Sequence, residues 1–144
     1  MREGYLLIET NPDHPGRIRI QGAESRPVES PIDGSPGPHA RLRYVARFGD
    51  LDAALMHAHT ALRRGLIDID AHLYSTDPVT AVGAIDAIDL SHRRIYLDPE
   101  LAADPALEAE IGRRRRMHRR IDRIWNGVGI AAILLLITTL LLGF

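Results

Sequence analysis

The chain has 144 residues, enough for one domain of about 100 residues and a further segment. It contains no cysteine, which excludes disulfides and thiolate metal sites, and an aromatic content of 5% leaves few rings for stacking on nucleic-acid bases. All 18 basic residues are arginine; 11 of them precede position 113 together with 18 acidic residues, so an acidic body is followed by a short basic stretch.

The first third of the chain predicts three strands. Residues 5–9 and 17–21 are short apolar runs joined by a turn with two prolines, and residues 40–48 alternate between apolar side chains and arginines, as in a half-buried strand. Residues 22–39 hold four prolines and three glycines, which exclude a long helix there.

Aspartates predict the starts of the helices, because aspartate is a favoured N-cap and proline suits the first helical position. The predicted caps are Asp50, Asp77, Asp98 and Asp104, the last three each followed by proline. The last helix is expected to run through the arginine stretch to the end of the chain. Two short runs, 72–75 and 93–97, are further strand candidates.

The last segment predicts a transmembrane helix. No charged residue occurs from Val128 to Phe144, and Ile124 and Trp125 extend the stretch to about 20 residues, which spans a hydrocarbon core of ~30 Å. The alternative, a buried core helix, is disfavoured because the segment is apolar on all faces, lies at the C-terminus and follows an arginine cluster. We therefore expect a tail-anchored, single-pass protein of the inner (plasma) membrane of a bacterial cell.

The arginine stretch sets the expected orientation. Arginine flanks mark the cytoplasmic side, tryptophan favours the interface, and the first residues show no signal-peptide pattern, so the body is expected in the cytoplasm. We expect these side chains to bind anionic lipid head groups at about 1 kcal/mol per arginine. The predicted membrane-surface residues are Arg113, Arg114, Arg115, Arg116, Arg119, Arg120, Arg123 and Trp125.

Six short motifs occur in order between residues 4 and 88: GYLLIETNP, PGRIRI, GSPGP, HTAL, HLYSTDP and TAVGAI. In this order they resemble the GIY-YIG nuclease superfamily, in its phage-type branch with a K-I-G motif. The resemblance implies an α+β fold with a small three-stranded antiparallel sheet flanked by helices, in agreement with the pattern of elements. It also implies metal-assisted phosphodiester hydrolysis, with Mg²⁺ as cofactor only if the activity is retained.

The family's functional positions are changed in this chain. The motif tyrosine falls at Leu7, with Tyr5 nearby, and the second motif reads Arg19-Ile20-Gln21, whose guanidinium cannot act as a base. The nearest counterpart of the catalytic arginine is Arg26, and the metal-binding glutamate matches His72, a poor Mg²⁺ ligand. Tyr5, Arg19, Arg26 and His72 are therefore candidates for a vestigial site, and no catalytic or metal-binding residue is predicted.

Several other polar side chains could be functional or could simply be structural or solvent-exposed. His57 and His59 are two apart on a helix and point ~200° apart, so they are not expected to share a metal ion. The arginines at 41, 43 and 47 share one strand face that is either solvated or in contact with phosphate or an acidic partner. Arg19 either binds an anion or is solvated.

We expect a GIY-YIG-like domain over residues 1–97, soluble without the tail, a helical arginine-rich linker over 98–124 and a transmembrane helix over 125–144. The leading hypothesis is a catalytically inactive binding or adaptor module with an unidentified protein partner; a homo-oligomer stays open. The alternatives are a tethered endonuclease, using Arg19, Arg26 and a carboxylate such as Asp70 or Asp77, and a DNA-binding module. The acidic body disfavours both, and the resemblance favours them.

Overall fold

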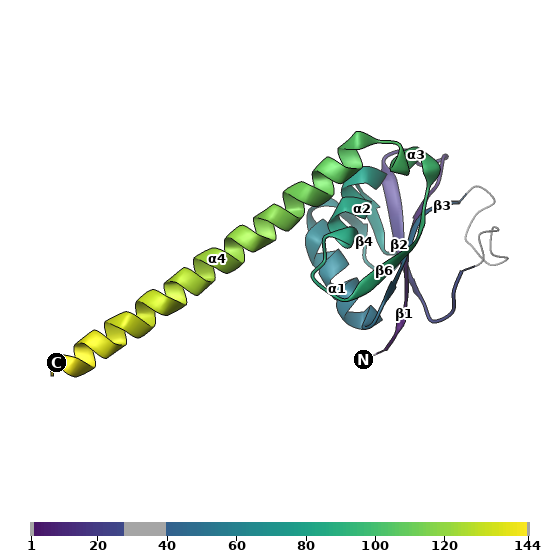
Figure 1. Ribbon diagram of the computed structural model, residues 1–144. Helices are drawn as coiled ribbons and strands as arrows, with labels where there is room; N and C mark the ends of the chain where they lie inside the picture. Colours follow the sequence, from purple (N-terminus) through teal and green to yellow (C-terminus); the bar gives the residue numbers. More distant parts are fainter. Residues whose placement is uncertain (1, 28–39, 144) are drawn as a thin grey trace.

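Within residues 2–27 and 40–143, which the computed structural model describes, six antiparallel strands form one sheet in the spatial order β4-β5-β2-β1-β3-β6 (Figure 1). The strands are β1 (Gly4–Thr10), β2 (Arg17–Ala23), β3 (Arg41–Phe48), β4 (Leu66–Asp68), β5 (Leu73–Ser75) and β6 (His92–Leu97). The predicted α+β class is confirmed, as are the three long strands. The described sheet has six strands rather than the three that the resemblance implies, because three further strands extend its two edges; β5 and β6 match the two further strand candidates, and β4 is an addition. The GSPGP motif at 34–38 lies outside the described residues.

The helices in the same described ranges are α1 (Leu51–Leu62), α2 (Pro78–Asp86), α3 (Pro99–Ala102) and α4 (Pro105–Leu141), and a short 3₁₀ turn, η1 (Arg63–Gly65), follows α1. All four predicted aspartate caps are confirmed, since each carboxylate accepts a hydrogen bond from a backbone N–H in the first turn of its helix. These local signals therefore place the starts of the helices correctly.

One face of the sheet carries the core. Strand alternation turns Leu6 and Ile8 of β1, with their neighbours on β2 and β3, toward α1 and α2, where they are fully buried. The first turns of α4 pack against α2 and add Leu107 and Ile111 to the same core. The molecule is thus layered as sheet, then α1 and α2, then the start of α4 (Figure 1).

A glycine allows α4 to lie close to α2. A Cβ at Gly83 would stand 2.6 Å from Cγ and 3.2 Å from Cβ of Glu110, closer than side-chain atoms normally approach. Because Glu110 is in turn held by Arg113 and Arg114, it has little freedom to move aside. The contact between the two helices depends on the absence of a side chain at position 83.

The core continues past residue 97. Leu101 of α3 and both Leu107 and Ile111 of α4 are almost fully buried in the cluster that the strands and helices of the body share. The α4 helix then runs without a break across the expected boundary between linker and membrane segment. The body and the long helix are therefore joined through the core itself.

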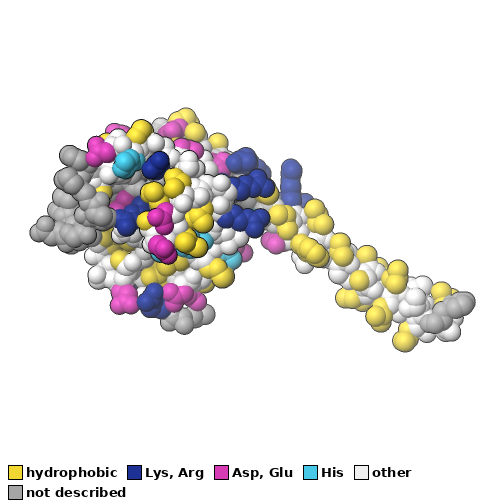
Figure 2. Space-filling model, turned by 180° about the vertical axis from the view of Figure 1, so that it is seen from behind, with side chains coloured by type: hydrophobic (Ala, Val, Ile, Leu, Met, Phe, Trp, Pro, Cys, Tyr) yellow, Lys and Arg dark blue, Asp and Glu magenta, His cyan; other side chains and the backbone are white. Residues whose placement is uncertain are grey.

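The rest of α4 projects from the body as a stalk with an apolar surface (Figures 1 and 2). It is long and apolar enough to cross a membrane, and the most apolar part of it is not buried against any other part of the described chain. From Ile124 to Leu141 the helix has 18 residues, or ~27 Å, close to the thickness of a hydrocarbon core.

Candidate functional site at the base of α4

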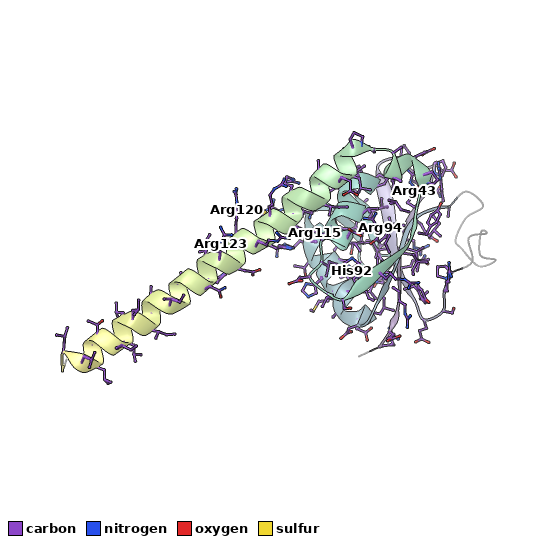
Figure 3. All side chains as sticks on the ribbon, in the orientation of Figure 1. Arg43, His92, Arg94, Arg115, Arg120 and Arg123 are labelled. Carbon is purple, nitrogen blue, oxygen red and sulfur yellow. The ribbon has the colours of Figure 1, made fainter. Side chains whose placement is uncertain are left out.

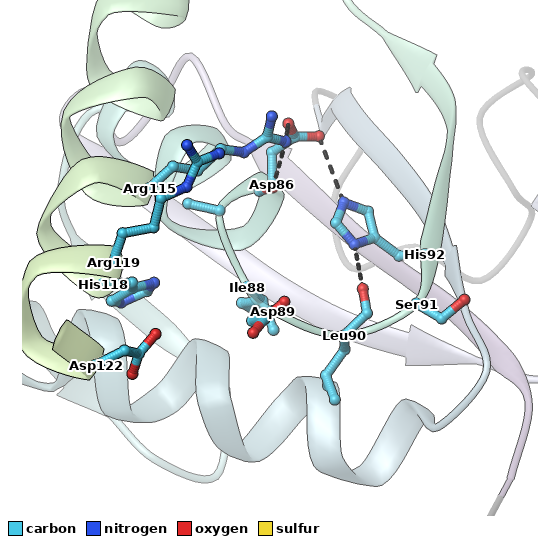
Figure 4. A pocket seen from close by; sticks show the side chains of 11 residues that line it. Asp86, Ile88, Asp89, Leu90, Ser91, His92, Arg115, His118, Arg119 and Asp122 are labelled. Atoms are coloured by element: carbon cyan, nitrogen blue, oxygen red, sulfur yellow. Dashed lines mark hydrogen bonds and ion pairs between the residues drawn. The ribbon is translucent and has the colours of Figure 1, made fainter. Parts of the chain in front are cut away.

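The carboxylate of Asp86 joins the body to α4. It lies at the end of α2, is 5% exposed, and accepts hydrogen bonds from the hydroxyl of Tyr44 at 3.0 Å and Nε of Arg94 at 3.2 Å. A second guanidinium, that of Arg115 on α4, contacts the same carboxylate at 3.2 Å, and Nε2 of His92 lies 3.8 Å away (Figure 4). Strands β3 and β6 and helix α4 thus meet at one buried acid.

Electrostatics keeps this acid ionised. Burial alone would raise the pKa of Asp86, but the hydrogen bond and charge of Arg94, together with the Tyr44 hydroxyl, outweigh burial and hold the pKa below its ordinary value. For the Tyr44 phenol, burial and the adjacent Asp86 charge both raise the pKa, so this hydroxyl stays a proton donor. The group is a structural ion-pair network in which two guanidiniums share one buried carboxylate.

A cavity of about 480 Å³ lies beside this network, between α4 and the loop that leads from α2 to β6 (Figure 4). The loop contributes Asp89, Leu90 and Ser91, which lie opposite the turns of α4 that follow Arg115. The imidazole of His92, at the end of the cavity next to Asp86, is fixed by a 2.7 Å hydrogen bond between Nδ1 and the carbonyl oxygen of Leu90. The residues from α4 are Arg115, His118, Arg119 and Asp122.

The arginine stretch divides into two groups. Arg113 and Arg114 form ion pairs with Glu110, and Arg115 pairs with Asp86, so each of these three arginines already has an ion-pair partner within the chain. The other four have no ion-pair partner among the described residues: Arg116, Arg119, Arg120 and Arg123.

These unpaired arginines follow a helical stripe. Positions 116, 120 and 123 share one side of α4, turned away from the side that carries Ile111, and Arg119 stands at the border with the cavity. Figure 3 shows Arg120 pointing away from the body and Arg115 pointing toward it. Trp125 is exposed two residues after Arg123.

The four vestigial-site candidates lie in two places. Arg19 on β2 donates a 3.2 Å hydrogen bond from Nε to the carbonyl oxygen of Ala71, next to His72. Tyr5 pairs with Ala23 at the other end of β2, four positions along β1 from the partner of Arg19, or ~13 Å. Arg26 is exposed and follows that same end of β2. Arg19 therefore lies near the backbone beside His72, at the opposite end of β2 from Tyr5 and Arg26, but the ring of His72 packs against His59 of α1.

His72 has an unexpected environment. Its φ of 50° lies in the left-handed region, and its ring meets that of His59 edge to face, with centroids 4.9 Å apart. His59 also hydrogen-bonds the hydroxyl of the buried Tyr74, and burial followed by the proximity of His72 lowers the pKa of His59. His59 on α1 therefore contacts both His72 and Tyr74. Within the described ranges, no group of three or more metal-ligating side chains lies close enough to hold a metal ion.

The remaining candidates have structural partners. Arg41 and Arg43 both bind Asp98, the buried cap of α3, as well as Glu100, and Arg47 pairs with Glu3. Two carboxylates named for the nuclease alternative lie in local turns: that of Asp77 caps α2, and Asp70 follows β4 in a turn held by Asp68.

Sequence patterns did not single out Asp86, although one signal was present. It is a lone carboxylate within the apolar run AVGAIDAI, and a charged group buried with such neighbours requires a partner of opposite charge. Comparisons with family models, with curated proteins and with solved structures found no match for this chain.

Proposed function

We propose that this protein is a single-pass membrane protein whose body is a non-catalytic binding or adaptor module, held at the cytoplasmic face by α4. One observation carries the proposal: α4 begins in the core of the body and continues unbroken into an exposed apolar segment of about membrane thickness. An 18-residue apolar stretch in water would be costly, at roughly 25 cal/mol per Å² of exposed apolar surface, whereas lipid removes that cost.

The proposed orientation rests on charge. Seven arginines stand within the twelve residues before Trp125 and none follows it, which favours a cytoplasmic body under the positive-inside rule. Four of these arginines have no ion-pair partner in the described part of the chain, and the last of them, Arg123, directly precedes the apolar segment. Those on the side of α4 that faces away from the body, Arg116, Arg120 and Arg123, are the ones we assign to anionic lipid head groups.

The proposal of a binding module without catalysis is supported by the distribution of the vestigial positions. A phosphodiesterase needs its base, its cation and its metal ligand around one phosphate. Tyr5 and Arg26 instead lie at one end of β2 and Arg19 and His72 at the other. A GIY-YIG-like ancestry, a tethered endonuclease and a DNA-binding module stay alternatives; the order of the six sequence motifs is what favours them.

The orientation can be tested with a reporter that is active only outside the cytoplasm. Fused after Phe144 it is expected to be active, and fused before Met1 it is expected to be inactive, because the arginines hold their flank inside. Alkaline carbonate washing of the membranes should leave the full chain in the pellet. An inactive reporter at the C-terminus together with an active one at the N-terminus would show the opposite orientation. Release of the chain by carbonate would show that α4 does not anchor it in the membrane.

The full chain in detergent is expected not to nick plasmid DNA with Mg²⁺ or Mn²⁺. Loss of one general base or acid costs ~10²–10⁴-fold in rate, and two such losses leave nothing measurable. Gel electrophoresis of supercoiled plasmid gives the readout, with Arg19→Ala, Arg26→Ala and His72→Ala as matched samples. Metal-dependent nicking that any of these substitutions abolishes would support the endonuclease alternative instead. His72→Glu alone is expected to remain inactive, because Leu7 leaves the attacking water without assistance.

A further inference from the structure

The cavity at the base of α4 is lined by charges of both signs that are not paired with one another. The side chains of Asp89, His118, Arg119 and Asp122 face this space, yet none has a hydrogen-bond or ion-pair partner among residues 2–27 and 40–143 (Figure 4). The neighbouring Asp86 and Arg115, by contrast, satisfy each other. Two carboxylates, one guanidinium and one imidazole are therefore free to bind a ligand that carries both charges.

The position of the cavity along α4 indicates where such a ligand comes from. Asp122 precedes the apolar stretch that starts at Ile124 by two residues, or ~3 Å of helix, and Arg119 precedes it by ~7.5 Å. The head-group layer on each side of a bilayer is about 5–7 Å thick. With α4 across the membrane, the lower part of the cavity stands at the depth of the lipid head groups.

We propose that this cavity binds the head group of a phosphoethanolamine lipid, which carries a primary ammonium group and no charge beyond that and its phosphate. This inference rests on the proposed membrane insertion of α4. The guanidinium of Arg119, with His118 one residue before it, meets the phosphate. The carboxylates of Asp89 and Asp122 accept hydrogen bonds from the ammonium group.

The lining distinguishes this head group from the other common ones. A choline head group has no N–H donor and is best held by aromatic rings, and histidine supplies the only rings in this cavity. A glycerol head group leaves the phosphate charge unbalanced beside two carboxylates, which repel it. A serine head group also carries –NH₃⁺, but it adds a carboxylate that the same two acids repel. Charge-assisted hydrogen bonds from –NH₃⁺ to both carboxylates therefore favour phosphoethanolamine.

Trp125, the single tryptophan, provides the measurement. It follows Asp122 by three residues on α4, so lipids with brominated chains that occupy the cavity should quench its fluorescence. The full chain is reconstituted in phosphatidylcholine vesicles with a small fraction of brominated lipid. We expect brominated phosphatidylethanolamine to bind about tenfold more strongly at this site than brominated phosphatidylcholine or phosphatidylglycerol, a difference of ~1.4 kcal/mol.

Substitutions on the two sides of α4 separate the site from general lipid contact. Arg119→Gln and Asp89→Asn should each abolish the preference, whereas Arg120→Gln, on the side away from the body, should retain it. Equal quenching by all three lipids, or loss of the preference in Arg120→Gln as well, would overturn the site. Displacement of the lipid by micromolar free phosphoethanolamine would assign the cavity to a soluble ligand and overturn the lipid. Absence of quenching by any brominated lipid would instead refute the membrane insertion on which the inference rests.

Discussion

Asp86→Ala is expected to lower the free energy of unfolding by about 3 kcal/mol. The substitution leaves the hydroxyl of Tyr44, a fully buried side chain, without its acceptor, and an unsatisfied buried polar group costs ~1–3 kcal/mol. It also removes the partner of Arg94 and Arg115, which are partly exposed and recover some of the loss through water. The start of α4 should then separate more readily from the body.

Chemical denaturation of the full chain in detergent micelles, followed by circular dichroism, measures this effect. The matched control is Asp52→Ala, which removes an acid from an exposed ion pair with Arg2 and should cost less than ~1 kcal/mol. Equal losses in the two variants would show that Asp86 does not hold the helix in place.

The same carboxylate gives a pH dependence with a definite sign. The pKa of Asp86 is lower in the folded chain than in the unfolded one, so its contribution is fully present above the unfolded pKa, near 4. It is lost as the pH falls through the folded pKa. The difference in stability between the natural chain and Asp86→Ala should therefore shrink under acid conditions, and a difference independent of pH would argue against an ionised Asp86.

The second large effect concerns where the chain is cut. A fragment ending at Asp98 loses three almost fully buried core residues, Leu101, Leu107 and Ile111, as well as Arg115. Removing one buried Leu or Ile side chain lowers the free energy of unfolding by ~2–5 kcal/mol. The loss of three such side chains approaches or exceeds a typical total free energy of unfolding of ~5–15 kcal/mol. We therefore expect this fragment to aggregate.

A fragment ending at Arg123 keeps these side chains and omits the apolar segment, so it is expected to be soluble and folded without detergent. Size-exclusion chromatography and circular dichroism compare the two fragments directly. If the shorter one is equally soluble and equally helical, the core contacts of α3 and α4 are dispensable, and an independent domain over residues 1–97, as the sequence pattern indicates, would be supported.

The features predicted correctly from the sequence are those that depend on neighbouring residues. Each aspartate cap acts on the next few backbone N–H groups, and the alternation of residues 40–48 directly reports β3. The apolar segment is recognised by its composition alone. By contrast, β4 has only three residues, all exposed, and forms because β5 lies beside it. No local pattern encodes such a pairing.

The candidate site was harder to foresee for a related reason. Arg115 was expected at the membrane surface together with its neighbours, but its guanidinium pairs with an acid 29 positions earlier in the chain. Which arginines of a basic stretch turn inward depends on the rotation of α4 against α2. That rotation is set by the close contact at Gly83 and by the burial of Ile111, both of which are tertiary features.

With α4 inserted in a bilayer as proposed, the continuity of this helix determines how the body is oriented on the membrane. With no loop between Arg115 and Ile124, each residue in that interval turns the body by about 100° around the membrane normal and sets its height in steps of ~1.5 Å. Inserting one residue would rotate the body so that a different side of it faces a given direction in the membrane plane. Inserting seven residues, close to two full turns, would nearly restore the original rotation and place the body about 10 Å farther from the membrane. The number of residues between Arg115 and Ile124 therefore sets the rotation of the body about the axis of α4.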